Sequence, residues 1–420
     1  MRIVIFSLLF CLMLISFLAT PAPQTIEIYD VILIALPCFL AILCMVTITN
    51  YTLYQPEYSV FIAVIWYLSY LLLSVLISIL EGVPILNILR AIGPYIDFFP
   101  LLVLCILPKN LLNILSIGLI LIFVGIIQAS YQIYLYFSHA HDVINTFDVL
   151  RGRITLIEPR TTLPFVLCLA ILPMVFFARK VITFKDVVIQ LFTGFLILLS
   201  LFAGIVTLTR SIVLAILFGW LVFFMLYFYQ RYQKNALRLF DIVLRSFIYL
   251  FLFSICIMMI SAIPKIQLLE QGLLARFYSA SSSAATDYSN GRIYDEWLPA
   301  MKTWLNSGVL SLFFGIGAGN KFLVANGEER TYIHNLCIYT LVYGGLYGFL
   351  SCIFLYIATF KSLLKKAIES NQMIYVGFAA LLASVFFYSQ FFAVHKGLAF
   401  NAMLFLMIAL ALRHQTLEEK

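Results

Sequence analysis

Long apolar runs, separated by short polar connections, repeat along the whole chain. Most of them extend for about 18 residues or more, the length that a helix needs to cross the hydrocarbon core of a bilayer. The pattern predicts twelve spans, at 3–20, 28–49, 58–80, 86–107, 111–137, 162–178, 187–208, 211–229, 241–263, 335–359, 372–391 and 397–412. We therefore predict an all-α membrane protein with about 12 transmembrane helices.

The composition supports this class. Of the 420 residues, 64% are hydrophobic and 11% are charged, whereas a soluble domain is about half apolar and a quarter charged. The first run, 3–20, is followed by the small residues of "FLATPAP", as in a signal peptide. A single Arg2 precedes that run, and we expect it to be retained as a helix.

Lysine and arginine in the short connections set the expected orientation, because these residues concentrate on the cytoplasmic side. They occur in every second connection, in "RKVITFK" (179–185), "QRYQKNALR" (230–238) and "KSLLKK" (361–366). Both termini are then cytoplasmic. The opposite side receives 20–27, 81–85, 138–161, 209–210, 264–334 and 392–396.

The connections divide the chain into three parts. Residues 1–263 hold nine helices and an arginine-rich outer segment at 138–162, residues 264–334 form one large outer loop, and residues 335–420 hold the last three helices and a short tail. Two short helices are predicted within the loop, one at 266–278 and one beginning near Arg292, which Pro299 would interrupt.

The second loop helix carries an apolar stripe at Ile293, Trp297, Met301 and Trp304, which we interpret as a packing face rather than a sugar platform. "GIGAGN" (315–320) follows it. No strand precedes these glycines, so we expect a turn that returns the chain to the membrane and not a phosphate loop.

Arginines gather on the predicted outer side, at Arg90, Arg151, Arg153, Arg160, Arg210, Arg276, Arg292 and Arg330. A guanidinium binds a phosphate group through two parallel hydrogen bonds. For the whole set we favour an anionic ligand. Pairing with nearby acidic residues or with lipid headgroups stays open for each single arginine.

His334-Asn335 directly precedes a predicted span, where free N–H groups and the helix dipole favour an anion. Gly345 and Gly348 on the same helix would let a neighbour approach closely and hold the histidine in place. Arg210 lies in a very short connection, "TLTRSIVLA", and must stay at the membrane surface. The alternative is an interfacial histidine satisfied by backbone or lipid.

This ordered set resembles the O-antigen ligase and polymerase family of bacterial surface-polysaccharide enzymes. His334-Asn335 followed by Gly345 and Gly348 is similar to the ligase form of the family's histidine pattern. Arg210 in "TLTRSIV" looks like its tight-turn arginine. Arg292 in "NGRIYDEW", with "GIGAG" behind it, looks like the second arginine. The resemblance covers roughly 140 to 350.

The resemblance implies a glycosyltransferase in the bacterial inner membrane, acting on the periplasmic face. The donor would be a glycan on undecaprenyl pyrophosphate, and the acceptor a sugar hydroxyl of lipid A-core or of a growing glycan. His334 would be the general base, Arg210 and Arg292 would bind pyrophosphate, and Arg153, Arg160 and Asn335 would contact substrate. Transfer would invert the anomeric carbon. Membrane lipids surround such a protein, and no nucleic acid is expected.

The expected mechanism needs no cofactor and no metal. The outer loops contain no Asp-x-Asp sequence, and the eight cysteines form no C-x-x-C pair. Two alternatives remain. A polymerase of O-antigen or another surface polysaccharide would use the same donor, and a transporter or flippase of lipid-linked sugars would instead require ionisable residues buried within the spans.

Overall fold

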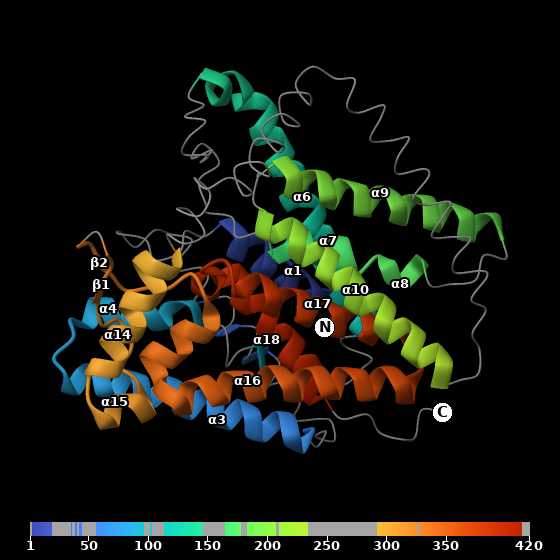
Figure 1. Ribbon diagram of the computed structural model, residues 1–420. Coiled ribbons are helices and arrows are strands. Elements are labelled where there is room, and N and C mark those ends of the chain that lie inside the picture. The colour runs from blue at the N-terminus through green and yellow to red at the C-terminus, as the bar shows by residue number, and fades with distance from the viewer. Residues whose placement is uncertain are drawn as a thin grey trace.

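The protein is described by a computed structural model that is mostly helical (Figure 1). The structure describes residues 2–18, 56–95, 113–145, 164–177, 183–206, 210–233, 292–325 and 327–413, together with 35, 38–39, 42–43 and 101–102. The predicted spans at 28–49 and 241–263 and the predicted loop helix at 266–278 lie outside these residues, apart from five positions in the first.

The helices within this part of the chain are α1 (Arg2–Leu18), α3 (Tyr58–Leu80), α4 (Ile85–Ile92), α6 (Ile114–Asn145), α7 (Pro164–Ile171), α8 (Met174–Phe177), α9 (Phe184–Val206), α10 (Arg210–Gln233), α14 (Leu298–Asn306), α15 (Val309–Phe314), α16 (Leu336–Ser370), α17 (Met373–Ser389) and α18 (Leu398–Leu412). Short turns of other helix types are η1 (Gly93–Tyr95), η3 (Arg292–Trp297) and η4 (Val394–Lys396). Strands β1 (Phe322–Leu323) and β2 (Glu329–Arg330) pair antiparallel.

Five of the described helices are long and apolar enough to cross a membrane: α3, the 114–134 part of α6, α9, α10 and α16. Four shorter apolar stretches lie in α1, α7–α8, α17 and α18. With the composition of the chain, these helices establish a mostly helical, multi-pass membrane protein. The total of twelve spans remains a prediction.

Proline and glycine change three of the predicted spans. The run at 86–107 starts as the short α4 and then changes at Gly93-Pro94 into the 3₁₀ turn η1. Pro173 separates α7 from α8, because a proline supplies no N–H to continue a helix. Helix α16 does not end near 359 but continues through the "KSLLKK" segment to Ser370, where Asn371 adopts a left-handed conformation.

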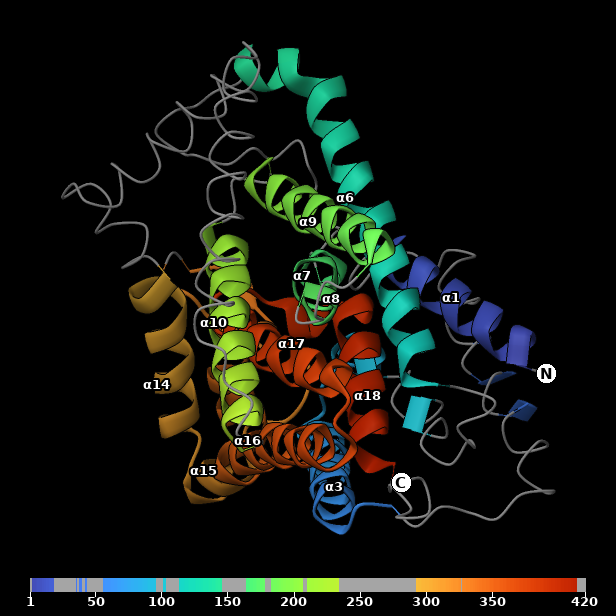
Figure 2. The same cartoon turned by 90° about the vertical axis from the view of Figure 1, so that its right-hand side faces the viewer.

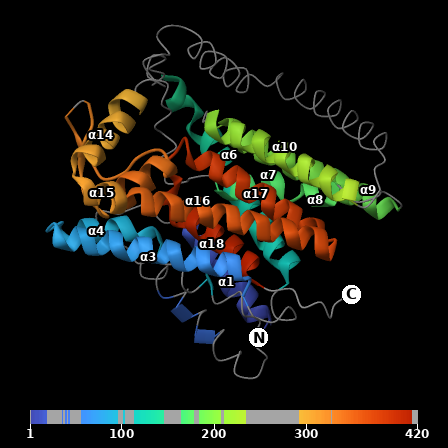
Figure 3. The ribbon, with the colours of Figure 1, turned by 60° about the horizontal axis from the view of Figure 1, so that its bottom comes forward.

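The most apolar helices lie in the centre. Every residue of α7 is buried, and so are nearly every residue of α18 and most residues of α17. A helix that is hydrophobic on all sides is expected inside a bundle. Helix α17 packs between α10 and α16 and also contacts α7 and α18, as Figure 2 shows. Seen from below, α10, α17, α16 and α3 follow one another as neighbouring rods (Figure 3).

Connections predicted for the same side of the membrane gather at the same end of the bundle. At one end, Lys396 of η4 donates to the carbonyl of Thr331, and Asn320 donates to Glu81. At the other end, Lys365 pairs with Glu57. The first end also holds α14, α15 and the strand pair (Figure 1). We call it the site end.

Candidate functional site

His334 and Glu296 form a hydrogen-bonded pair at the site end. Nδ1 of His334 lies 2.8 Å from Oε2 of Glu296, and the backbone N–H of His334 donates to Oε1 at 2.5 Å. An ionised carboxylate only accepts hydrogen bonds, so Nδ1 carries the proton. In the neutral imidazole, Nε2 then holds the free lone pair. This is the arrangement of a general base oriented by a second group.

The carboxylate of Glu296 is almost fully buried, with 3% of its side chain exposed, whereas His334 keeps 20%. Nη1 of Arg330 lies 3.4 Å from Oε2 of Glu296, and its Nη2 lies 3.1 Å from Glu328. Burial alone raises the pKa of Glu296. The hydrogen bonds and charge of His334 and the charge of Arg330 outweigh burial and lower that pKa below its ordinary 4.5.

A π-helical turn places Glu296 opposite His334. The chain from Arg292 to Trp297 is the π-helix η3, directly before Pro299 in the first turn of α14. The prediction of an apolar stripe that begins at Ile293 was based on 3.6 residues per turn. It is wrong at this first position, because Ile293 is 38% exposed. The π-helix changes the angular spacing, so the buried line is Glu296, Ala300 and Trp304.

The first turn of α16 is fixed by Asn335. Its Oδ1 accepts the N–H of Ile338 at 2.9 Å, which is a regular N-cap, and its Nδ2 donates to the carbonyl of Gln390 at 3.0 Å. One donor and one acceptor of the amide are therefore occupied by the protein. Asn335 links the start of α16 to the end of α17, and a substrate contact for it remains a prediction.

A kink in α16 lies nine residues beyond its start. Gly345 has φ 61° and ψ −163°, which interrupts the helix. The carbonyls of Val342 and Tyr343 accept instead from the backbone N–H groups of Ile316 and Gly317, at 2.9 and 3.2 Å. The "GIGAG" turn thus uses its N–H groups to satisfy carbonyls that the kink releases, which leaves them engaged within the protein.

Close approach explains both glycines of the histidine pattern. A Cβ on Gly345 would lie 2.3 Å from the carbonyl carbon of Phe313, and one on Gly348 would lie 2.7 Å from the ring of Tyr70. Real Cβ atoms do not approach backbone so closely. α15 and α3 therefore pack directly on α16, and they hold the helix that begins at His334-Asn335.

Arg292 and His334 meet at the segment that follows α17. Nη1 of Arg292 donates to the carbonyl of Phe391, and the ring of Phe392 lies 6.0 Å from that of His334, edge to face. Asn335 reaches Gln390 in the same segment. The structure thus brings together three of the residues that the sequence singled out.

Arg210 is the first residue of α10, which begins at the site end. Ser384, near the end of α17, donates to the carbonyl of Ala215 at 2.6 Å. Gln230, at the other end of α10, donates to the carbonyl of Ala367, far from the start of α16. Arg210 therefore shares one end of the bundle with His334. Two further sequence candidates, Arg153 and Arg160, lie outside the described residues.

Aromatic rings and one lysine complete the surroundings of His334. The ring of Tyr332 lies 5.3 Å from the imidazole. The ammonium of Lys396 lies 5.3 Å from the centroid of Tyr332 and 6.0 Å from that of Tyr339. Tyr339 in turn packs against His395, at 4.4 Å between centroids. The rings of Tyr332 and Phe392 therefore lie against the candidate base, and two cationic groups contact its neighbours, Lys396 at Tyr332 and Arg330 at Glu296.

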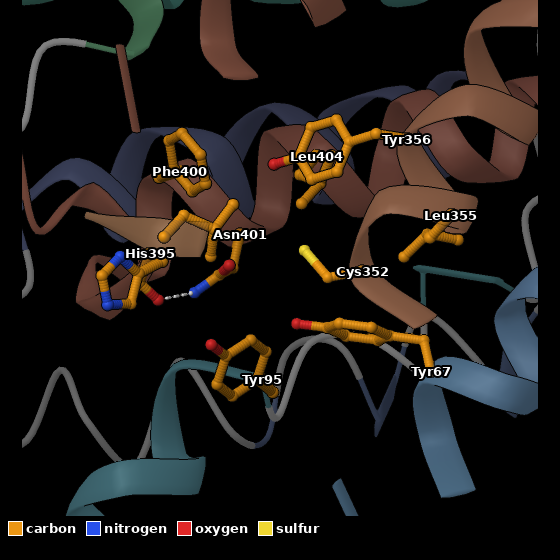
Figure 4. Close-up of a pocket in the computed structure, with 10 residues that line it drawn as sticks. Tyr67, Tyr95, Cys352, Leu355, Tyr356, His395, Phe400, Asn401 and Leu404 are labelled. Atoms are coloured by element: carbon orange, nitrogen blue, oxygen red, sulfur yellow. Dashed lines mark hydrogen bonds between the residues drawn. The ribbon is translucent and has the colours of Figure 1, made fainter. Parts of the chain in front are cut away.

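A small cavity lies beside His395 (Figure 4). Its lining includes Tyr67, Cys352, Tyr356, His395 and Asn401, and the centre of a water molecule can move within about 10 Å³ there. Within the described part of the chain, neither ring nitrogen of His395 has a hydrogen-bond partner, and burial lowers the pKa of this histidine well below its ordinary value.

Three residues of the site escaped the sequence analysis in these roles: Glu296, Arg330 and Lys396. Arg330 appeared only as one of the arginines on the predicted outer side, for which an anionic ligand was favoured, and Glu296 was not singled out. The one signal for Glu296 would be a carboxylate on the buried face of a loop helix. A search for 3.6-residue periodicity does not find that face, because the π-helical turn changes the spacing of the buried residues. No sequence pattern points to Lys396.

Among the described residues, no group of three or more histidine, cysteine, aspartate or glutamate side chains is placed to hold a metal ion. No protein-family model matches the chain, and no curated protein matches it. The evidence for a function of this protein therefore consists of the resemblance of its motifs and the geometry around His334.

Proposed function

We propose that this protein is a glycosyltransferase of the O-antigen ligase type, in the inner membrane of a bacterium. It transfers a glycan from undecaprenyl pyrophosphate to a sugar hydroxyl of lipid A-core on the periplasmic face. The observation that carries the proposal is the Glu296–His334 pair, at the end of a membrane helix bundle where Arg292 is also held.

The reaction uses His334 as the general base. Nε2 takes the proton of the acceptor hydroxyl while that oxygen attacks the anomeric carbon of the donor. The new bond joins the acceptor oxygen to the anomeric carbon, the bond from that carbon to the phosphate oxygen breaks, and the lipid pyrophosphate leaves with the electron pair. A single displacement of this kind inverts the configuration of the carbon.

Glu296 supports each stage of the proton transfer. Before the reaction, its carboxylate holds Nδ1–H and so keeps the lone pair on Nε2. After the transfer, the same carboxylate stabilises the imidazolium, because an opposite charge at hydrogen-bond distance favours the protonated ring. Against the opposing effect of burial, the hydrogen bonds and charge of His334, together with the charge of Arg330, hold the pKa of this carboxylate below its ordinary value.

Arg210 and Arg292 bind the pyrophosphate in this mechanism. Guanidinium groups match phosphate oxygens and keep their charge at every physiological pH. Positive charge beside the leaving group would stabilise the negative charge that develops on it, and the start of α10 and η3 both lie at the site end. Arg153 and Arg160 remain candidates for a second set of contacts to the phosphate or the glycan.

The test is a lipopolysaccharide gel of a deletion strain of the source bacterium, complemented with wild type or with His334→Ala. A ligase predicts that the deletion and His334→Ala both leave bare core while lipid-linked polymer accumulates. Core with a single repeat unit would identify a polymerase of the same donor. An unchanged ladder would reject both activities and favour another glycan, or the transport of lipid-linked sugars.

A further inference from the structure

Lys396 places a poorly compensated positive charge beside His334. Its ammonium donates to the carbonyl of Thr331 at 2.9 Å and faces the rings of Tyr332 and Tyr339. Within the described residues it forms no ion pair. Two other lysines do, since Lys321 lies 2.6 Å from Glu329 and Lys365 lies 3.2 Å from Glu57.

The surroundings of Lys396 disfavour its own charge. Burial lowers the pKa of its ammonium to about 8. A cation withdrawn from water is stabilised by a nearby anion. Within the described residues, the buried carboxylate of the candidate site, Glu296, already pairs with His334 and Arg330. The missing negative charge is therefore one that a ligand can supply.

We propose that Lys396 binds the phosphate oxygens of the lipid-linked donor on the η4 side of His334. It is then a substrate-binding residue of the same site, besides the two arginines. An ammonium has three donors and is held here by one backbone carbonyl, so two remain to reach an anion. This inference rests on the proposed function, in which the donor carries a pyrophosphate.

A structural role is the competing explanation, because Lys396 also connects η4 to the loop before α16. The substitution Lys396→Met keeps the aliphatic stem and removes the charge, whereas Lys396→Arg keeps the charge at every pH. Lys321→Met is the matched control, since Lys321 lies at the same end of the bundle and is half exposed.

The experiment measures binding of undecaprenyl pyrophosphate to the full-length protein in nanodiscs at pH 7 and pH 9.5. We expect Lys396→Met to bind roughly tenfold or more weakly than wild type at pH 7, the effect of losing one charge-assisted hydrogen bond. We expect Lys321→Met to bind like wild type. Unfolding curves of each variant check that it remains folded.

The pH series provides the second arm. Among the described residues, the titratable groups that lie against Lys396 are Tyr332, Tyr339 and its neighbour His395. Affinity of wild type should fall between the two pH values as Lys396 loses its proton, and that of Lys396→Arg should persist. Equal binding by Lys396→Met and wild type, or the same pH dependence in wild type and Lys396→Arg, would overturn the inference. Failure of wild type itself to bind would reject the proposed function.

Discussion

The hydrogen bond between Nδ1 of His334 and Glu296 determines which ring nitrogen can act as a base. The pair joins two residues 38 positions apart in the sequence, and the carboxylate is nearly inaccessible to water. An isolated interfacial histidine would exchange its proton between both nitrogens. The buried partner removes this ambiguity, and the following two predictions concern its charge.

Replacing Glu296 by glutamine should lower the rate of glycan transfer by about 100-fold or more, with little change in donor binding. The amide keeps the shape of the side chain but lacks the negative charge that stabilises the imidazolium. Transfer assays with the purified variant measure this. Glu329→Gln, an exposed change in the same loop, is the control, and equal rates for wild type and Glu296→Gln would remove Glu296 from the mechanism.

The Glu296 carboxylate should also make stability depend on pH. Because its pKa is lowered in the folded protein, its stabilising contribution is complete above the ordinary value of 4.5 and disappears as the pH falls through the lowered pKa. Thermal unfolding between about pH 6 and pH 3 should show the difference in Tm between wild type and Glu296→Gln shrinking at low pH. A constant difference would contradict this assignment.

At the scale of elements, the kink of α16 and the "GIGAG" turn form one unit. The turn supplies N–H groups to the carbonyls of Val342 and Tyr343, and Ser74 and Ser78 of α3 bond to the same region through Tyr343 and Ala318. The glycine spacing that resembles a phosphate loop is thus explained by helix packing. The unit holds the start of α16 against α3 and α15.

Gly345→Ala should destabilise the protein by several kcal/mol and abolish transfer. A left-handed conformation alone costs about 1–3 kcal/mol for a residue with a side chain, and the new Cβ would overlap the backbone of Phe313. Gly204→Ala is the control. Gly204 lies within α9, and a Cβ added there would make an ordinary contact, 3.5 Å from Ile216 of α10. Unfolding midpoints of the two variants measure the difference, and equal midpoints would show that the kink is dispensable.

For the whole molecule, the proposed function requires that the site end faces the periplasm. The site end holds the predicted outer connections that the structure describes, and the opposite end holds the lysines near the end of α16. The positive-inside rule predicts that this opposite end lies in the cytoplasm. The orientation decides whether the site can meet a donor and an acceptor outside the cytoplasm.

Two exposed positions test this orientation in a cysteine-free version of the protein. Cysteine placed at Lys321 should react with a small membrane-impermeant maleimide in intact cells. Cysteine placed at Glu369, near the other end of α16, should react only after the inner membrane is permeabilised. The reverse pattern would place the site in the cytoplasm and reject a periplasmic transfer.

The sequence alone determined the class of protein and much of the bundle. Apolar length and composition are local properties, and a helix in lipid satisfies its own backbone. For that reason, the edges of α3, α9, α10, α17 and α18 lie close to the predicted ones. The start of α16 after Asn335 was also predictable, because a capping residue acts within one turn.

Only the tertiary structure decided how the candidate site is composed. Its hydrogen bonds join residues that are far apart in the sequence. Glu296 and His334 are separated by 38 positions, Lys396 and Thr331 by 65, and Arg292 and Phe391 by 99. Hydropathy and motif spacing describe neighbours along one helix, whereas these contacts depend on how separate elements pack. The π-helical turn before Pro299 and the kink at Gly345 shift side chains by fractions of a turn, and such shifts are settled by packing.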